Sequence, residues 1–382
     1  MVALYLFWLS LFVLAYTYVG FTLLLVVWAQ LFPKPYDSRS TYPSTSMIIA
    51  AYNEQDGIQK KLDNILSLDY PKLEVIIASD GSDDLTNTIV SEYTGDTVKL
   101  LALPRGGKHV ALNAAVEIAT GEILVFSDAN SIYEKEALQH LTSPFADPKV
   151  GGVAGNQRYL KSNQSTANAG EHSYWSFDRF LKKMESASGN VISATGAIYA
   201  IRRSLYQPVL GGVTDDFYIS TNVIVEGYRL VFAPEAVAYE PTAKSQKNEY
   251  GRKVRIMTRG LNAVLQRRTL LNPFRYGFYS LQLFTHKILR RLLYLPLILI
   301  FVTNILLLSR GWFYQLVMLA QLGFYGMAFA GWFLEKRGQK LPKLVSIPTY
   351  ICMVYWAAAH ATWNVLRGRR IERWSTVREE AV

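Results

Sequence analysis

Cysteine is almost absent from the sequence: the single Cys352 cannot form an internal disulfide bond, so nothing in the chain needs an oxidising compartment. The five histidines are scattered and show no spacing typical of a zinc site. Charged residues make up only 18% of the 382 residues and hydrophobic residues 50%, which is too apolar for a disordered chain. This length suggests two or three structural units.

Four motifs of nucleotide-binding and hydrolytic enzymes are also missing. The chain has no G-x-x-x-x-G-K-[ST], because Pro104–Lys108 has the wrong spacing, and no G-x-G-x-x-G, G-x-S-x-G or H-E-x-x-H. Nucleotide hydrolysis by a P-loop, dinucleotide redox chemistry and serine hydrolysis therefore lose support.

The net charge of +10 is concentrated in one segment. Residues 244–291 hold twelve lysines and arginines and one acid, Glu249, which accounts for the whole positive excess. A basic segment can bind nucleic acid, but this one directly precedes long apolar runs. We therefore expect it to face an anionic membrane surface, and we expect no nucleic-acid partner.

The first 33 residues contain no charged side chain and are long enough to cross a bilayer. A cleaved signal peptide is the alternative, but no basic residue precedes the apolar run and no small-x-small cleavage site follows it. Lys34 and Arg39 come directly after the run, so the positive-inside rule places the following residues in the cytosol. No organelle-targeting signal is evident, and a bacterial plasma membrane is the expected location.

Three further apolar runs occupy residues 292–366, namely Leu292–Leu308, Trp312–Leu334 and Leu344–Leu366. The first has 17 residues and is short for a span, whereas the other two are long enough. If all three cross the membrane, the basic tail at residues 367–382 lies outside, against the positive-inside rule. Either the tail is an exception, or Leu344–Leu366, which contains Pro348, is re-entrant or interfacial.

Residues 45–243 resemble a soluble domain in which strand and helix patterns alternate. The predicted strands are Met47–Ala51, Glu74–Ser79, Val98–Leu103 and Ile123–Ser127, and the predicted helices are Ile58–Leu68, Asn87–Tyr93 and Lys108–Ala119. Such alternation of helices with apolar strands predicts an α/β fold around a parallel sheet. The later runs Gly152–Tyr159, Gly196–Ile201 and Tyr228–Phe232 are expected to extend or flank that sheet.

The basic segment begins with a predicted helix over residues 250–268. Val254, Met257 and Leu261 share one face with arginines nearby, which is typical of a helix that lies in the membrane interface. The alternative is an ordinary amphipathic helix that packs on the sheet. The aromatic-rich stretch Phe274–Phe284 is expected at the interface too, so that residues 244–291 form a set of interface helices.

Polar residues follow three of the predicted strands: Tyr52, Asp80 and Asp128. Because ligands bind at the carboxyl ends of strands in open α/β sheets, we expect these residues to meet in one crevice. A single aspartate after a strand more often serves a turn or a helix cap. Three such residues at strand ends favour a binding site for a nucleotide or a metal.

Acids also stand at two later positions of the same region. Asp215 and Asp216 precede a helical run, where they can cap the helix, or where Asp216 can act as a general base for a hydroxyl group. Glu240 could reach a metal, but we expect it to be a solvated surface acid.

These residues in this order resemble the family 2 glycosyltransferases of the cellulose synthase superfamily, which includes hyaluronan synthases and ceramide glucosyltransferase. The resemblance runs from about Thr45 to the C-terminus. It rests on Ala51-Tyr52-Asn53-Glu54, Ser79-Asp80-Gly81-Ser82, Arg105-Gly106-Gly107-Lys108 with Asn113, Phe126-Ser127-Asp128-Ala129-Asn130, Gly196-Ala197, Thr214-Asp215-Asp216, Arg252-Lys253-Val254-Arg255 and His286-Lys287 with Arg290. Each motif is weak alone, but the ordered set between apolar segments is specific.

The resemblance implies a glycosyltransferase A-type, Rossmann-like cytosolic domain with transmembrane helices at both ends. It also implies the residues that contact the nucleotide-sugar donor, which are Tyr52, Glu54, Asp80, Lys108 and Asp128. Asp128 and Asn130 fall on the two acidic positions of the family's D-x-D motif, which binds Mg²⁺ or Mn²⁺.

For catalysis, the resemblance implies that Asp216, with Asp215 beside it, matches the T-E-D motif that supplies the catalytic base. Arg252 and Arg255 match the (Q/R)-x-x-R-W motif, which lies near the diphosphate and the acceptor. The sequence departs from the family at Asn130, where an amide replaces an acid, and at Ile256, where the tryptophan is missing. The first departure weakens the expectation of a metal, and the second weakens the expectation of polymer synthesis.

We therefore expect an integral membrane, inverting glycosyltransferase that transfers a sugar from a nucleotide-sugar, a UDP-sugar, to a lipid-linked or glycan acceptor. The expected organisation is a membrane helix at residues 1–33, a catalytic domain at 45–243, interface helices at 244–291, about three membrane segments at 292–366 and a basic tail at 367–382. Two alternatives stay open. One is a processive polysaccharide synthase that also exports its polymer, and the other is an inactive membrane scaffold that keeps the fold.

Overall fold

The structure is a computed structural model that describes residues 1–159, 168–241, 249–339, 341–369 and 371. Two compact units can be distinguished. The sheet unit contains residues 25–241 and Gln266–Tyr279, and the helical unit contains Met1–Leu24, residues 249–265 and residues 280–369. Residues 242–248, at the start of the predicted basic segment, and residues 372–382 of the predicted tail lie outside the described residues.

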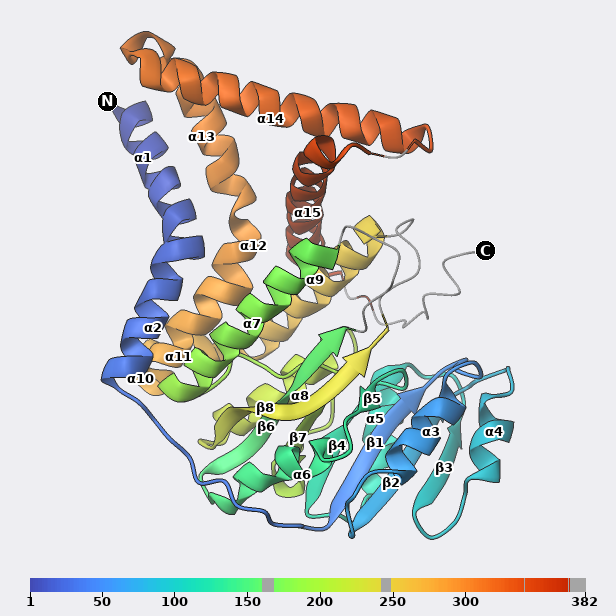
Figure 1. The fold of residues 1–382 in the computed structure, drawn as a ribbon. Helices are drawn as coiled ribbons and strands as arrows, with labels where there is room; N and C mark the ends of the chain where they lie inside the picture. Colours follow the sequence, from blue (N-terminus) through green and yellow to red (C-terminus); the bar gives the residue numbers. More distant parts are fainter. Residues whose placement is uncertain (160–167, 242–248, 340, 370, 372–382) are drawn as a thin grey trace. The chain divides into compact units, whose positions relative to one another are not determined.

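The sheet unit is organised around one mixed sheet of eight described strands (Figure 1). The strands are β1 (Thr45–Ala51), β2 (Leu73–Asp80), β3 (Val98–Leu103), β4 (Ile123–Phe126), β5 (Ile132–Tyr133), β6 (Val150–Tyr159), β7 (Tyr199–Arg202) and β8 (Arg229–Glu240). Their order across the sheet is β3-β2-β1-β4-β7-β6-β8-β5. The predicted α/β fold is confirmed, and the predicted strand positions agree with these bounds to within a few residues, except for β8, which continues to Glu240.

The direction of the strands differs from the prediction in the second half of the sheet. β1 to β4 are parallel, as predicted, but β7 runs antiparallel to both β4 and β6, and β5 runs antiparallel to β8. β6 and β8 are parallel to each other. An apolar run indicates that a strand is buried on both faces, but it does not indicate the direction of the strand. The sequence pattern could therefore not predict this reversal.

Helices cover the buried strands of the parallel half. The helices of the sheet unit are α3 (Ile58–Leu66), α4 (Thr86–Glu92), α5 (Lys108–Ile118), α6 (Ala137–Thr142), α7 (Asn168–Ser188), α8 (Asp215–Val225) and α10 (Pro273–Tyr276). α3 turns Ile58, Leu62 and Ile65 into the core, where they join Ile49 and Ile77 of the sheet. This 3-4 spacing of apolar residues is the reason that α3 forms where it does.

The helical unit consists of long apolar helices. Its elements are α1 (Val2–Ala15), the π-helical turn η1 (Tyr16–Gly20), the start of α2 (Phe21–Leu31), α9 (Glu249–Gln266), the end of α11 (Phe278–Leu283), the π-helical segment η5 (Phe284–Leu289), α12 (Arg290–Leu292), α13 (Tyr294–Leu307), α14 (Trp312–Lys336) and α15 (Lys343–Leu366). Within this unit α1 lies beside α13 (Figure 1), and α14 contacts α15.

Three of the described helices are long and apolar enough to cross a membrane: Val2–Leu31, Trp312–Lys336 and Lys343–Leu366. The predicted run Leu292–Leu308 differs, because its helix begins at Tyr294, after a bend of 50° that separates it from Phe278–Leu292. Together the bent pair can form a fourth span. The third helix continues through Pro348 without a break, which disfavours a re-entrant loop for this segment.

The amphipathic helix α9 buries its apolar side within the protein. Val254 and Val264 are buried, whereas Leu265 and Ile256 are exposed. The position of α9 at a membrane interface stays a prediction. The arginines of α9 are only partly buried.

Glu74, near the start of β2, joins three neighbouring segments of the sheet unit. Its carboxylate pairs with Lys99 of β3 at 2.6 Å and accepts hydrogen bonds from the Thr120 N–H group at 3.0 Å and from the Ser46 hydroxyl. Burial alone would raise the pKa of Glu74, but these hydrogen bonds and the charge of Lys99 outweigh it and lower the pKa to about 2.

Substitution Glu74→Gln should therefore destabilise the protein in a pH-dependent way. Because the pKa of Glu74 is lower in the folded than in the unfolded state, its stabilisation is complete above the ordinary value of 4.5 and is lost as the pH falls toward 2. Loss of the charged hydrogen bonds should cost about 1–3 kcal/mol near pH 7. Thermal unfolding in detergent, followed by tryptophan fluorescence, measures this, with exposed Glu92→Gln as control. A pH-independent difference between the variants would contradict the assignment.

Candidate active site

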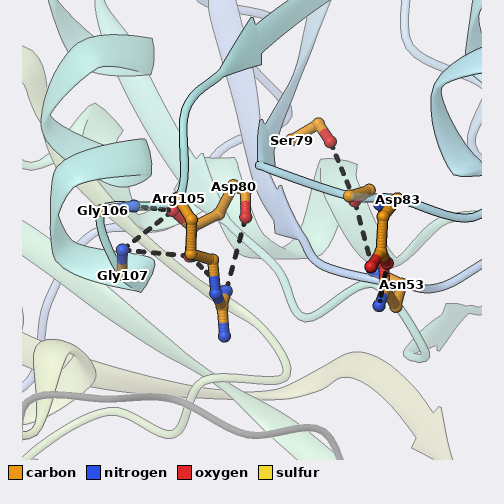
Figure 2. A network of polar contacts seen from close by, with 8 residues as sticks. Asn53, Ser79, Asp80, Asp83, Arg105, Gly106 and Gly107 are labelled. Carbon is orange, nitrogen blue, oxygen red and sulfur yellow. Dashed lines mark hydrogen bonds and ion pairs between the residues drawn. The ribbon is translucent and has the colours of Figure 1, made fainter.

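The loop that joins β3 to α5 is anchored on the carboxylate of Asp80, at the end of β2. Asp80 is fully buried and accepts hydrogen bonds from the backbone N–H groups of Gly106 at 2.7 Å and Gly107 at 2.8 Å (Figure 2). Its other oxygen accepts a bond from Arg105 Nη1 at 2.5 Å. Gly81 permits this approach, because a Cβ atom there would lie 2.7 Å from the Arg105 nitrogen, and its φ of +66° suits glycine.

The end of β1 is joined to the same region. The guanidinium of Arg105 lies 3.3 Å from the ring centroid of Tyr52, which is nearly buried. Asn53 adopts a left-handed backbone with φ of 51°, and its side-chain amide bonds with Asp83 in both directions, at 2.6 and 3.1 Å (Figure 2). The N–H group of Glu54 donates to Thr86 Oγ1 at 2.8 Å. The ends of β1 and β2 are thus held in a fixed geometry.

Lys108, the first residue of α5, bridges two acids. Its Nζ lies 2.8 Å from Asp128 Oδ1, after β4, and 3.0 Å from Asp215 Oδ2, at the start of α8. Burial alone would lower the pKa of Lys108, but the two carboxylates outweigh it and raise the pKa above its usual value. The ammonium is therefore charged at any physiological pH, and it connects the sheet to the helix that carries Asp216.

Asp216 lies at the N-terminus of α8, where its Oδ1 accepts the N–H group of Phe217 at 2.6 Å. Tyr199 of β7 is buried close by, stacked on Phe126 with 4.9 Å between ring centroids. Burial and the charges of Asp215 and Asp216 raise the pKa of Tyr199 well above its usual value, so its hydroxyl stays protonated. The first turn of α8 therefore places a second acid beside the bridged Asp215.

The predicted ligands of a divalent cation are Asp128 and Asn130. The side chain of Asp128 is 32% exposed and that of Asn130 is exposed, so both can be reached by a ligand. Carboxylate and amide oxygens suit Mg²⁺ or Mn²⁺, with the remaining positions left to phosphate and water. Among the described residues, no group of three histidine, cysteine or acidic side chains is placed to hold a metal ion. These two residues can therefore supply only part of a coordination shell.

Arg252 and Arg255 lie on α9, in the helical unit. Arg252 pairs with Glu249 at 3.7 Å, and Arg255 is partly buried. Ile256, at the position of the missing tryptophan, is 45% exposed. A role for these arginines near a diphosphate stays a prediction.

Sequence reasoning missed Lys61, which is fully buried on α3. Its Nζ donates to Ser127 Oγ at 2.8 Å and to the Ser131 carbonyl at 2.5 Å, and it lies 4.4 Å from the centroid of the Tyr133 ring. Burial lowers the pKa of Lys61 to about 7, although Asp128 and Glu240 oppose this shift. The available signal was a lysine on the apolar face of a helix, three residues after Ile58 and four before Ile65.

Glu240 differs from the solvated surface acid that we expected. It is only partly exposed, and its carboxylate accepts bonds from Ser131 Oγ at 3.3 Å and from Gln157 Nε2 at 2.5 Å. Burial and the nearby charge of Asp128 raise the pKa of Glu240 to about 7. The physical reason is that β8 continues to Glu240 and pairs there with β5, which draws the side chain into the sheet unit.

Comparison with solved structures identifies the fold. The mannosyltransferase PcManGT from Pyrobaculum calidifontis, solved in complex with GDP-Man and Mn²⁺, matches with a TM-score of 0.70 and 24% identity, covering 94% of this chain and 99% of that chain. The fold is that of a glycosyltransferase of the GT-A type, as the sequence predicted.

The sequence comparisons identify a family for part of the chain. Residues 46–210 match glycosyl transferase family 2, so this part of the chain carries a family 2 glycosyltransferase domain. Poly-beta-1,6-N-acetyl-D-glucosamine synthases of Staphylococcus aureus (strain MSSA476) and Staphylococcus epidermidis are each 28% identical over 201 residues, which are 51% of this chain and 49% of theirs. The match thus spans about half the length of these curated relatives.

The close packing of Gly196 against Asp128 gives a test of the metal position. A Cβ atom at Gly196 would lie 2.8 Å from Asp128 Oδ2, too close to be accommodated without a shift of the carboxylate. Gly196→Ala should weaken the Mn²⁺-dependent binding of UDP by about tenfold or more, since overpacking typically costs 1–3 kcal/mol. Isothermal titration with and without Mn²⁺ measures this. Gly95→Ala, which has open space around it, is the control, and equal effects of the two variants would argue against the assignment.

Lys61 should be needed to hold the Ser127–Ser131 loop, which carries Asp128 and Asn130. Lys61→Met keeps most of the volume but leaves the buried Ser131 carbonyl without its donor, which should cost about 1–3 kcal/mol. We expect weaker UDP binding in the presence of Mn²⁺, together with a lower unfolding temperature. The neighbouring Lys60 is exposed on the same helix, so Lys60→Met should change neither quantity. Unchanged UDP affinity in Lys61→Met would refute this role.

Proposed function

We propose that the chain is a membrane-bound inverting glycosyltransferase that transfers a sugar from a nucleotide-sugar, a UDP-sugar, to a lipid-linked or glycan acceptor. The observation that carries this proposal is the bridge from Lys108 to Asp128 and Asp215. It gathers a cation and two acids from three separate elements at one end of the parallel strands, beside Asp216. In α/β sheets of this kind, this end of the strands is where ligands bind.

The donor's nucleotide would bind at the ends of β1 and β2. Tyr52 offers an aromatic face, and Glu54 and Asp80 offer acceptors for hydroxyl or N–H groups of the nucleoside. Lys108 would face the diphosphate, where its charge opposes the negative charge that grows as the leaving group departs. Asp128 and Asn130 would hold Mg²⁺ or Mn²⁺, which supplies additional stabilisation of that charge when bound.

Asp216 would act as the catalytic base. An acceptor hydroxyl passes its proton to the Asp216 carboxylate while its oxygen forms the new bond to the anomeric carbon. The bond from that carbon to the diphosphate breaks, the nucleoside diphosphate leaves with the electron pair, and attack from the opposite face inverts the centre. Asp215 would hold Lys108 in place, and Arg252 and Arg255 would approach the diphosphate and the acceptor.

The apolar helices support a location in the membrane. The positive charge that follows the first candidate span supports a cytosolic catalytic domain, on the side where nucleotide-sugars are available. The acceptor would then arrive along the bilayer, and membrane lipids would be partners in their own right. A bacterial plasma membrane remains the proposed location.

The similarity to poly-beta-1,6-N-acetyl-D-glucosamine synthases favours a second candidate function, the processive synthesis of a polysaccharide that is also exported. Two features of this chain support single transfer instead. Ile256 stands where the tryptophan would be, and the described residues contain at most four candidate spans, few for a self-contained export channel. The length of a labelled product separates the two functions, because a synthase gives a ladder and a single transferase gives one addition.

Nucleotide release tests the proposed function directly. The full chain in nanodiscs is supplied with UDP-, GDP- or dTDP-sugars, Mg²⁺ or Mn²⁺ and membrane lipids, and release of the nucleotide is measured. We expect release from one donor, and we expect Asp216→Asn to reduce its rate by about 10²–10⁴-fold, because a positioned general base contributes about that much.

The matched control is Asp96→Asn, an exposed aspartate in the turn before β3, which should leave the rate unchanged. UDP binding by Asp216→Asn should persist, since the base does not hold the nucleotide. Intact UDP binding in the wild type with no release from any donor would favour the inactive scaffold over the enzyme.

A further inference from the structure

Arg290 and Arg291 occupy an unusual place for charged residues. They lie on the short helix α12, within the three residues that end the first arm of the bent pair Phe278–Leu292 and Tyr294–Arg310. Together the two helices are long and apolar enough to form one membrane span. Ionisable groups within such segments are costly and are retained where they bind something.

The guanidinium of Arg291 is packed tightly against α9. A Cβ atom at Gly260 would lie 2.5 Å from Arg291 Nη2 and 3.1 Å from Cζ, so the glycine makes room for the guanidinium. Its Nη1 donates to the Lys287 carbonyl at 3.1 Å. That bond uses one of the five N–H donors of the group.

Arg290 faces two tyrosines. Its guanidinium lies 6.0 Å from the centroid of the Tyr18 ring, and the Tyr18 and Tyr355 hydroxyls are hydrogen-bonded to each other. Both phenols come from long apolar helices of the helical unit. Two arginines and two hydroxyl donors therefore gather at the bend.

The helical unit supplies no negative charge to balance these cations. The sequence contains no aspartate or glutamate between Glu249 and Glu335, and none in residues 1–24. Glu249 is paired with Arg252 and Lys253. In the part of the chain that the structure describes, neither Arg290 nor Arg291 forms an ion pair with a carboxylate. Partly buried cations of this kind need a countercharge.

From this arrangement we propose that Arg290 and Arg291, with Tyr18 and Tyr355, bind the phosphate group of a membrane lipid. Guanidinium groups match the oxygens of phosphate bidentately, which lysine cannot do. The lipid's phosphate would supply the missing countercharge, and its chains would lie along the apolar helices that flank the bend. No carboxylate competes for these donors.

A lipid phosphate can come from two sources. One is the acceptor itself, as a lipid carrying a terminal phosphate, and this reading rests on the proposed function. The other is an ordinary anionic phospholipid that holds the helices together. The chemistry of recognition is the same, so the experiment has to compare the two lipids on one protein.

Native mass spectrometry of the full chain in maltoside micelles provides this comparison. The probes are a polyprenyl monophosphate, phosphatidylglycerol and diacylglycerol, the last of which lacks phosphate. We expect a phosphate-bearing lipid to bind in preference to diacylglycerol. Arg290→Gln should weaken that binding about tenfold or more, because a charge-assisted hydrogen bond is lost, and Arg291→Gln should do the same.

The matched control is Arg310→Gln, an exposed arginine beyond the other end of α13, which should bind lipid as the wild type does. Arg290→Lys, which keeps the charge but loses the bidentate geometry, should fall between wild type and Arg290→Gln. Because Arg291 is tightly packed and its variant can misfold, Arg290→Gln is the deciding variant. UDP binding on the same preparations reports whether the sheet unit is intact.

Each outcome has a distinct meaning. Preference for polyprenyl phosphate that depends on Arg290 supports an acceptor site, and equal binding of phosphatidylglycerol with the same dependence supports a phospholipid site. Equal binding of diacylglycerol, or equal affinities of wild type and Arg290→Gln, overturns the proposal. Lipid binding is measured without a donor, so absence of sugar transfer would leave this result standing and count against the proposed function alone.

Discussion

A four-residue loop, Arg105 to Lys108, connects the acidic ends of the strands to one another, and the geometry of the candidate site depends on it. Its backbone N–H groups are fixed on the buried Asp80, so Lys108 begins α5 at a defined point. From there its ammonium reaches Asp128 and Asp215. Because a single cation holds both acids, the end of β4 and the start of α8 are kept together without direct contact between like charges.

A second lysine, Lys61, supports the same region from within the core. Lys61 places a second amino group beneath the Ser127–Ser131 loop, where its hydrogen bonds fix the two ends of that loop. The region around Asp128 is therefore held by lysine side chains from two helices. At the proposed site for a diphosphate and a cation, this support would keep the acids close to one another before a ligand binds.

Much of this could be predicted from the sequence, and the exceptions have physical causes. The strands ending at Tyr52, Asp80 and Asp128 were predictable, because apolar runs followed by polar residues mark the ends of buried strands. The direction of the strands was not predictable, because β7 has the same apolar pattern in either direction. Lys61 was missed because composition treats a lysine as solvated, and only the 58–61–65 spacing placed it on the buried face. The burial of Glu240 was missed because it depends on the length of β8, which no local sequence pattern determines.

The anchoring of Asp80 has a consequence for how the site opens to a ligand. Its two oxygens already receive bonds from Gly106, Gly107 and Arg105, so a carboxylate with about four lone-pair sites has little capacity left. A nucleobase that donates an N–H group to Asp80 would have to displace one of these protein donors. Of the three, only Arg105 donates from a side chain, which can rotate away. Leaving Asp80 also takes the guanidinium off Tyr52 and uncovers its ring. If the nucleotide binds at Asp80 as proposed, the Arg105 side chain has to move first, so this contact would limit the rate of nucleotide association more than the final affinity.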